Sequence, residues 1–158
     1  MSVSVQEADF DAGAEIAALS SGRDDVGAVA SFVGLVRADK SSERVGAGRT
    51  AAVQAMTLEH YPGMTEKALE AIVAEARGRW DVYGLRVIHR VGRLLPGDRI
   101  VLVAVASAHR GEAFAACEFI MDYLKTRAPF WKKEETAAGG RWVDARESDD
   151  HAAGRWNT

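Results

Sequence analysis

The chain has 158 residues, one cysteine and a formal net charge of −3, with acidic and basic residues mixed along most of its length. This length fits one domain with a substantial core, and a single cysteine excludes a disulfide framework. The charge mixture argues against a general nucleic-acid surface, and no run approaches the roughly 20 apolar residues of a membrane span. The acidic N-terminus lacks the basic and then apolar pattern of a signal peptide, so we expect a cytoplasmic protein.

Strand and helix patterns alternate irregularly in the first third of the chain. Residues 2–6 alternate as a short strand, and residues 10–19 form a predicted helix with Asp11 as its N-cap. Residues 26–37 have the pattern of a strand whose glycines mark bulges or close approaches to the backbone. The polar, glycine-rich segment 38–50 predicts a mobile loop.

The middle of the chain predicts one more helix and three strands. Residues 52–59 form a strand, and Pro62 and Gly63 open a helix that ends at residue 79. Residues 85–95 and 100–107 predict two strands joined by a Pro-Gly-Asp turn, hence an antiparallel hairpin. A mixture of this kind, without regular βαβ alternation, indicates an α+β fold. His89 lies inside the hairpin, where a structural role is commoner than a catalytic one.

A helix follows the last of these strands and ends at Pro129, which lacks the backbone N–H that the helix needs. Its apolar residues recur at spacings of three and four and predict a face directed at the core: Phe114, Cys117, Met121 and Leu124. His109 and Arg110 precede the helix, where backbone N–H groups and an arginine fork favour anions. Arg37 ends another strand, and we expect Arg37, His109 and Arg110 to converge on a phosphate group if the two strands are neighbours.

Lysines surround the aromatic turn after this helix. Lys125 lies in its last turn, and Lys132 and Lys133 follow Phe130 and Trp131. They could be solvated surface charges near a helix C-terminus. Packing of the aromatic rings would instead desolvate an amine and lower the pKa of a lysine towards base or nucleophile chemistry.

Other chemistries have little support in the sequence. Cys117 lies on the apolar helix face, which favours a packing role over a reactive thiolate or persulfide. The four histidines form no ligand-spaced pair, so we expect no metal site, and we expect no cofactor. Residues 1–146 are predicted to form a single catalytic domain and residues 147–158 a flexible C-terminal tail.

Six segments carry a resemblance to a known family. They are FVGLVR (32–37), LEHYPGM (58–64), IHRVG (88–92), PGD (96–98), SAHR (107–110) and MDYLKTRAPFWKKE (121–134). In order and spacing they resemble the large, catalytic subunit of molybdopterin synthase, the MoaE family. One departure is Leu35, where the family often has lysine, and it puts a side-chain contact from that position in doubt.

The resemblance implies an α/β hammerhead-type fold with a mixed or antiparallel sheet and an added β subdomain. It implies a sulfurtransferase that uses the thiocarboxylated C-terminal Gly-Gly of a small ubiquitin-like subunit to convert cyclic pyranopterin monophosphate into molybdopterin. The enzyme would be a homodimer within a heterotetramer. Lys125 and Lys132 would be catalytic, with their division of roles open, and substrate would bind Phe32, Arg37, His109, Arg110, Lys133 and Glu134. The alternative is a non-catalytic dimeric module that binds a ubiquitin-like protein or a phosphorylated metabolite.

Overall fold

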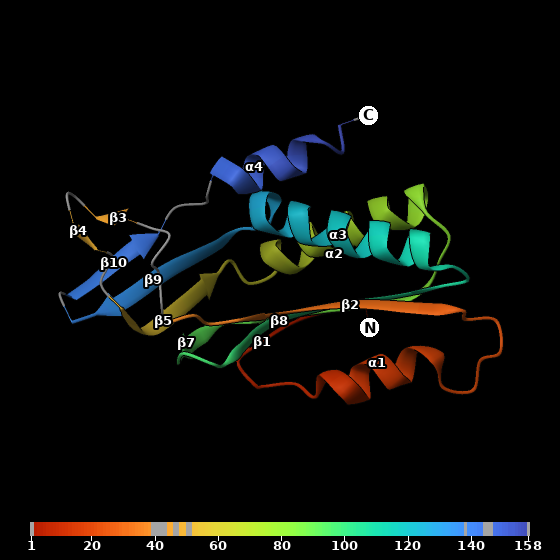
Figure 1. Cartoon of the computed structure of the whole chain (residues 1–158), viewed down its shortest axis with the longest axis horizontal. Coiled ribbons are helices and arrows are strands. Elements are labelled where there is room, and N and C mark those ends of the chain that lie inside the picture. The colour runs from red at the N-terminus through yellow and green to blue at the C-terminus, as the bar shows by residue number, and fades with distance from the viewer. Residues whose placement is uncertain are drawn as a thin grey trace.

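The computed structural model describes residues 2–38, 44–45, 48–49, 52–137, 139–143 and 147–157. Two four-stranded sheets organise this part of the chain, with helices on both faces of the first (Figure 1). The first sheet has the order β1-β6-β8-β2, in which only the β1–β6 pair is parallel. Its strands are β1 (Val3–Gln6), β2 (Ala28–Leu35), β6 (Val82–Arg90) and β8 (Arg99–Ser107).

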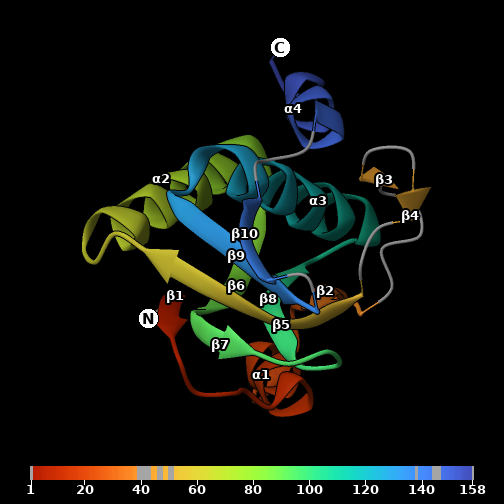
Figure 2. The same ribbon diagram turned by 90° about the vertical axis from the view of Figure 1, so that its left-hand side faces the viewer.

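The second sheet forms a subdomain at one end of the first (Figure 1), and this end faces the viewer in Figure 2. It is antiparallel, with the order β10-β9-β5-β7. Its strands are β5 (Val53–His60), β7 (Gly92–Leu94), β9 (Phe130–Thr136) and β10 (Gly139–Val143). This arrangement confirms the predicted α+β class and the added β subdomain.

Helices α2 (Met64–Arg79) and α3 (Arg110–Arg127) cover one face of the first sheet, and α1 (Ala12–Ser20) covers the other (Figure 1). The main core lies under α2 and α3, where the fully buried Val103, Phe119 and Ile120 meet. Asp11 caps α1 as predicted, because its Oδ1 accepts a hydrogen bond from Ala14 N at 3.0 Å.

The predicted strand 85–95 is two strands that belong to different sheets. Gly92 has φ +89°, a conformation that side chains disfavour, and at this point the chain leaves β6 for β7. The predicted antiparallel pairing exists between β6 and β8, with His89 opposite Val101. The prediction of one continuous hairpin strand was therefore wrong, because a single glycine redirects the chain.

The predicted loop 38–50 falls partly outside the described residues. Its described residues form a short antiparallel ladder between β3 (Arg44–Val45) and β4 (Gly48–Arg49).

The C-terminal segment differs from the predicted flexible tail. Residues Glu147–Gly154 form helix α4, which lies on α3 (Figure 1). Beyond α4, Trp156 packs its indole edge-on to Trp80 and Phe119, with ring centroids 5.5 and 5.6 Å away. Arg155 pairs with Glu118 on α3. Residues 147–154 carry no apolar stripe from which a helix could be predicted, and the ion pair and ring contact with α3 come from Arg155 and Trp156, beyond the end of α4.

Candidate active site

The corner between α3 and β9 holds the two lysines that were predicted to be catalytic. Helix α3 ends at Arg127 with Ala128 as its C-cap, and Pro129 leads directly into β9. The buried Thr65 fixes this corner, because its hydroxyl donates to Pro129 O and accepts from Tyr61 N, both at 3.0 Å. Lys125 is exposed in the last turn of α3. The corner thus fixes the backbone between Lys125 and the start of β9.

Strand β9 separates its two adjacent lysines. Successive side chains of a strand point to opposite faces, so Lys132 shares a face with Phe130 and Glu134, whereas Lys133 points the other way. Lys132 is half-buried and lies opposite Leu58 on β5. Lys133 is exposed, with its Nζ 5.8 Å from the ring centre of Trp142. The lysines predicted to flank one corner together therefore lie on two faces of the sheet.

Glu134 shares the face of Lys132 and is fully buried. Its carboxylate lies 3.4 Å from Nη2 of Arg141, the residue directly opposite on β10. A buried carboxylate needs a hydrogen-bonded cation, and Arg141 provides one from the neighbouring strand. This pair ties β9 to β10 beneath Lys132.

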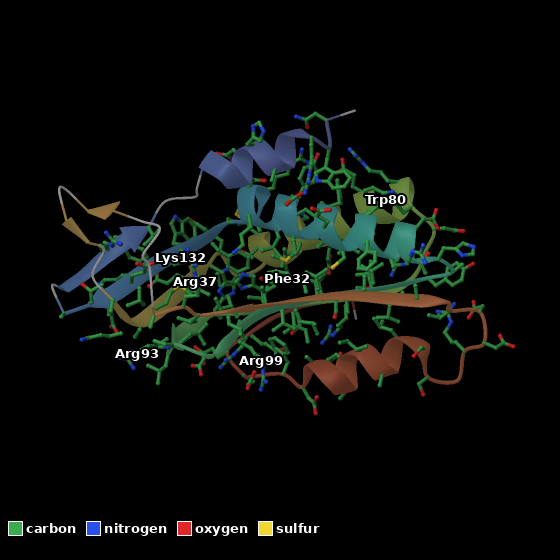
Figure 3. All side chains as sticks on the ribbon, viewed as in Figure 1. Phe32, Arg37, Trp80, Arg93, Arg99 and Lys132 are labelled. Carbon is green, nitrogen blue, oxygen red and sulfur yellow. The ribbon has the colours of Figure 1, made fainter. Side chains whose placement is uncertain are left out.

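Arg37 lies at the same end of the molecule as Lys132. It follows β2, where Val36 N donates to Asp98 O at 2.9 Å and Gly97 N donates to Val36 O at 2.9 Å. Val36 packs in one buried cluster with Leu58, the cross-strand neighbour of Lys132. Figure 3 shows Arg37 and Lys132 where the two sheets meet, with Phe32 further along β2. Phe32 is 42% exposed, which leaves an aromatic face open beside this region.

His109 and Arg110 do not join this group within one chain. His109 is the N-cap of α3, and both side chains are exposed. The β2–β8 ladder is antiparallel, with Ala28 opposite Ser107 and Leu35 next to Arg99. At about 3.3 Å per residue, the eight-residue β2 places Arg37 about 25 Å from the His109 end. The expected convergence of Arg37, His109 and Arg110 is therefore wrong for a single chain, although the strands are neighbours.

The junction beside His109 depends on a close backbone approach. Gly27 N donates to Ser107 O at 3.0 Å, and a Cβ on Gly27 would lie 2.1 Å from Ala108 O. No side chain fits at that distance, so Gly27 allows the start of β2 to lie against the strand-to-helix turn. The anion-favouring turn is thus held rigidly.

Cys117 has the environment of a packing residue. It is buried against β8, with its Sγ 3.7 Å from Val103 O. Burial, with a smaller contribution from the charge of Glu118, raises the pKa of the thiol to about 11. The thiol therefore stays protonated at neutral pH and is a poor nucleophile.

Phe114 departs from the predicted core face. It is 64% exposed, and the residues that bury instead include Ala113, Ala116 and Ile120. The spacing of apolar residues assigned Phe114 to the buried face of the helix, whereas the buried residue is its neighbour Ala113. Together with Phe32 and Leu35, which is 53% exposed, Phe114 adds apolar surface on β2 and α3.

Two contributors to the corner were missed or discounted in the sequence. Thr65 carries no chemical signature, although it follows directly on the LEHYPGM segment. His89, interpreted as structural, is 4% exposed and stacks on Phe130 with ring centroids 3.8 Å apart.

No helix in the described part of the chain is long and apolar enough to cross a membrane. Among the same residues, no group of three or more His, Cys, Asp or Glu side chains could hold a metal ion.

Comparisons with known proteins agree on one family. The family described as MoaE protein matches residues 5–127. A molybdopterin synthase catalytic subunit from Ralstonia nicotianae is 66% identical over 154 residues, which are 98% of this chain and 83% of that one. Among solved structures, a molybdopterin biosynthesis MoaE protein from Burkholderia ambifaria has a TM-score of 0.80 and 55% identity, covering 99% of this chain and 98% of that chain. A molybdopterin synthase from Staphylococcus aureus has a TM-score of 0.78 and 27% identity, covering 91% and 98%.

Proposed function

The chain belongs to the MoaE family of molybdopterin synthase catalytic subunits, and we propose that it transfers sulfur from the thiocarboxylated C-terminus of a small ubiquitin-like partner to cyclic pyranopterin monophosphate. Two such transfers give the dithiolene of molybdopterin. We further propose that it works in the cytoplasm, where its single thiol stays reduced.

The observation that supports this proposal is that Lys132 and Arg37 lie where the two sheets meet (Figure 3), while Lys125 lies in the last turn of the helix that leads into the strand of Lys132. An anionic substrate needs a cation with a planar fork, which Arg37 supplies. One lysine transfers protons as the cyclic phosphate opens, and the other stabilises or attacks the acyl group of the partner's terminus. The half-buried setting of Lys132 suits a group that must give up or accept a proton.

Substrate binding by His109 and Arg110 requires a second copy of the chain. Within the described residues, β2 is the terminal strand of its sheet, and its exposed Phe32 and Leu35 offer apolar surface. A two-fold axis through the β2 edge would pair this strand with its copy in antiparallel orientation. The Arg37 end of one chain would then lie beside the His109 end of the other. We propose that each site of the homodimer uses the lysines and Arg37 of one protomer and the anion-binding turn of its partner.

The deciding experiment combines purified protein, thiocarboxylated partner and precursor, and measures the pterin product. Lys125→Arg and Lys132→Arg are expected to lose at least about a hundredfold in turnover, because arginine keeps the charge but cannot release a proton near neutral pH. Lys67→Arg, on the outer face of α2, is the matched control. Near wild-type turnover in Lys125→Arg would show that this lysine acts only as a charge. Binding of both ligands without product would favour a non-catalytic module.

A further inference from the structure

The polar side chains that the structure buries completely include Thr65, in the first turn of α2. It lies where α2 meets the end of β5 and the α3–β9 corner. A buried hydroxyl costs free energy unless its hydrogen bonds are made. The bonds of Thr65 go to backbone atoms of Tyr61 and Pro129, which belong to segments far apart in the chain.

The hydroxyl of Thr65 acts as donor and acceptor at once. It donates to Pro129 O and accepts from Tyr61 N, both at 3.0 Å. The backbone N–H of Thr65 donates in turn to Tyr61 O at 2.9 Å. Thr65 is therefore held by two bonds to the residue that follows β5, and its single hydroxyl hydrogen is directed at the corner.

Helix α3 lacks the closing hydrogen bond that ends the other two helices of the first sheet. In α1 and α2 the C-cap N–H donates to the carbonyl oxygen four residues earlier. Among the described residues no such bond is made by Ala128, the C-cap of α3, and Pro129 has no N–H to offer. The Pro129 carbonyl is thus a group through which another element can hold the end of α3.

This carbonyl lies between the two lysines of the proposed site. Lys125 is four residues before Pro129, in the last turn of α3, and Lys132 is three residues after it, on β9. The next amide, Phe130 N, donates to Ala128 O at 2.9 Å, and Phe130 already belongs to the ladder of β9 with β5. A rotation at Pro129 would therefore move the helix that carries one lysine relative to the strand that carries the other.

We propose that Thr65 is a positioning residue for the reaction, whose hydroxyl holds the Pro129 carbonyl and so sets the placement of Lys125 relative to Lys132. Thr65 acts through the backbone and carries out no chemical step. A shift of about 1 Å in a catalytic group can cost about a hundredfold in rate, so one backbone bond at this corner is sufficient to matter. The inference rests on the function proposed above, in which both lysines serve one reaction.

The test compares four variants of the full-length protein. Thr65→Val and Thr65→Ala both remove the hydroxyl, and the alanine variant serves if the valine methyl does not fit beside Pro129 O. Thr65→Ser keeps the hydroxyl and loses only the methyl group. Thr126→Val is the matched control, because the Thr126 hydroxyl donates within α3, to Asp122 O at 3.2 Å. Turnover is measured where circular dichroism shows each variant folded, and amide hydrogen exchange is followed by NMR without substrate.

Thr65→Val and Thr65→Ala are expected to lose about tenfold to a hundredfold in kcat, with KM for the precursor within about twofold of wild type. Thr65→Ser should keep kcat within about threefold, and Thr126→Val should match wild type. The amides of Tyr61 and Phe130 should exchange about tenfold faster in the valine and alanine variants, because the hydrogen bonds at the corner are lost or loosened. Both amides should exchange as in wild type in Thr65→Ser and Thr126→Val.

Wild-type kcat in a folded Thr65→Val or Thr65→Ala protein would overturn the inference, and so would a rise in KM alone. Equal losses in all three variants of Thr65 would assign the effect to its methyl group, and an equal loss in Thr126→Val would show no special role for this hydroxyl. If the wild-type protein forms no product, the proposed function fails, whereas the exchange of the Tyr61 and Phe130 amides still decides whether the hydroxyl holds the corner.

Discussion

Cys117 and Lys125 lie on the same helix, yet their surroundings give them opposite chemistry. Cys117 faces β8 and is buried, which keeps its thiol protonated, whereas Lys125 lies exposed in the last turn beside the corner. Both are polar groups that could take part in sulfur transfer. Position along α3 decides which of them is reactive. We therefore expect the sulfur to remain on the partner until it reaches the substrate.

Cys117→Ala is expected to retain full turnover, because the substituted thiol has no part in the transfer. Loss of the buried sulfur should cost about 1 kcal/mol in the free energy of unfolding. Product assays and urea denaturation measure the two effects. A folded but inactive Cys117→Ala protein, or a persulfide trapped on Cys117 during turnover, would contradict the assignment.

Asp9 forms a clamp between the chain before α1 and the first sheet. Its Oδ2 accepts from Arg99 Nη2 at 2.7 Å, and its Oδ1 accepts from Phe10 N at 2.7 Å. Arg90 reaches the same carboxylate at 3.9 Å and donates to the carbonyl oxygen of Glu7. The hydrogen bond from Arg99 is the main cause that lowers the pKa of Asp9 from 3.8 to about 2.

This lowered pKa gives a defined pH window. The carboxylate stabilises the folded state fully above pH 4, and the effect is lost as pH falls from about 4 to about 2. Asp9→Asn should therefore be less stable than wild type at pH 6, and the difference should shrink as the pH falls below 4 and vanish only below about pH 2. Urea denaturation across this range measures it, with the exposed Asp24→Asn as control. A difference between wild type and Asp9→Asn that does not change with pH would contradict the charge-based explanation.

The sequence predicts which lysines are candidate site residues, but it does not show on which faces of the sheet they lie. Lys125 was placed correctly in the last turn of a helix because Pro129 marks its end unambiguously. Lys132 and Lys133 were assigned to one corner because residues 130–136 carry too many charges to resemble a strand. Pairing of β9 with β5 and β10 makes this segment a strand, so its successive side chains point to opposite faces of the sheet. That pairing is tertiary and cannot be read from the local sequence.

At the scale of elements, the C-terminal segment gives a clear energetic test. Trp156 packs against Trp80 and Phe119, and its Nε1 donates to Asp122 Oδ2 at 2.6 Å. Trp156→Ala should lower the free energy of unfolding by about 2–3 kcal/mol, somewhat below the cost at a fully buried aromatic site. Trp142→Ala, at a tryptophan that is 57% exposed, should change it by less than about 0.5 kcal/mol.

The same segment tests whether residues 1–146 form the catalytic domain. A chain that ends at residue 146 should lose stability comparably to Trp156→Ala and keep turnover at temperatures where it stays folded. Differential scanning calorimetry and the product assay measure the two quantities. Loss of turnover in a folded truncated protein would place residues 147–158 within the catalytic unit.

Helices with a strong hydrophobic periodicity or a clear terminating residue could be predicted from the sequence. Strand ends that depend on the chain passing from one sheet to the other could not. Helices α2 and α3 begin and end within two residues of the predicted positions because proline or a capping position marks their ends. The break between β6 and β7 depends on the positive φ of Gly92, for which a glycine alone is a weak signal. Helix α4 was not predicted because it is short and polar, and the ion pair and ring contact that attach this segment to α3 come from Arg155 and Trp156, which follow the helix.

For the whole molecule, the shared site predicts complementation between two inactive variants. Arg37→Ala and Arg110→Ala homodimers should each be inactive, since every site lacks one of the two arginines. A mixed dimer of these variants contains one site with both arginines missing and one with both present. It should recover up to about half of the wild-type activity per dimer.

Mixed dimers are obtained by co-expression with two different affinity tags and sequential purification. The control mixes Arg37→Ala with Lys125→Ala, both of which belong to the same half-site. That dimer should stay inactive, because each site then lacks one of the two side chains. Recovery in the control, or none in the first mixture, would contradict a site built from Arg37 of one chain and Arg110 of the other.

The antiparallel β2–β8 ladder places Arg37 and His109 at opposite ends of each protomer, so the proposed shared site has a kinetic consequence. If each site takes residues from both protomers as proposed, an isolated protomer holds two incomplete half-sites, and dilution below the dimer dissociation constant should abolish turnover without unfolding the chain. Initial rates should then rise with the square of the protein concentration and become linear only above that constant. Dimer formation would thus determine whether the enzyme is active, and the cellular concentration of the protein would determine what fraction of it is dimeric.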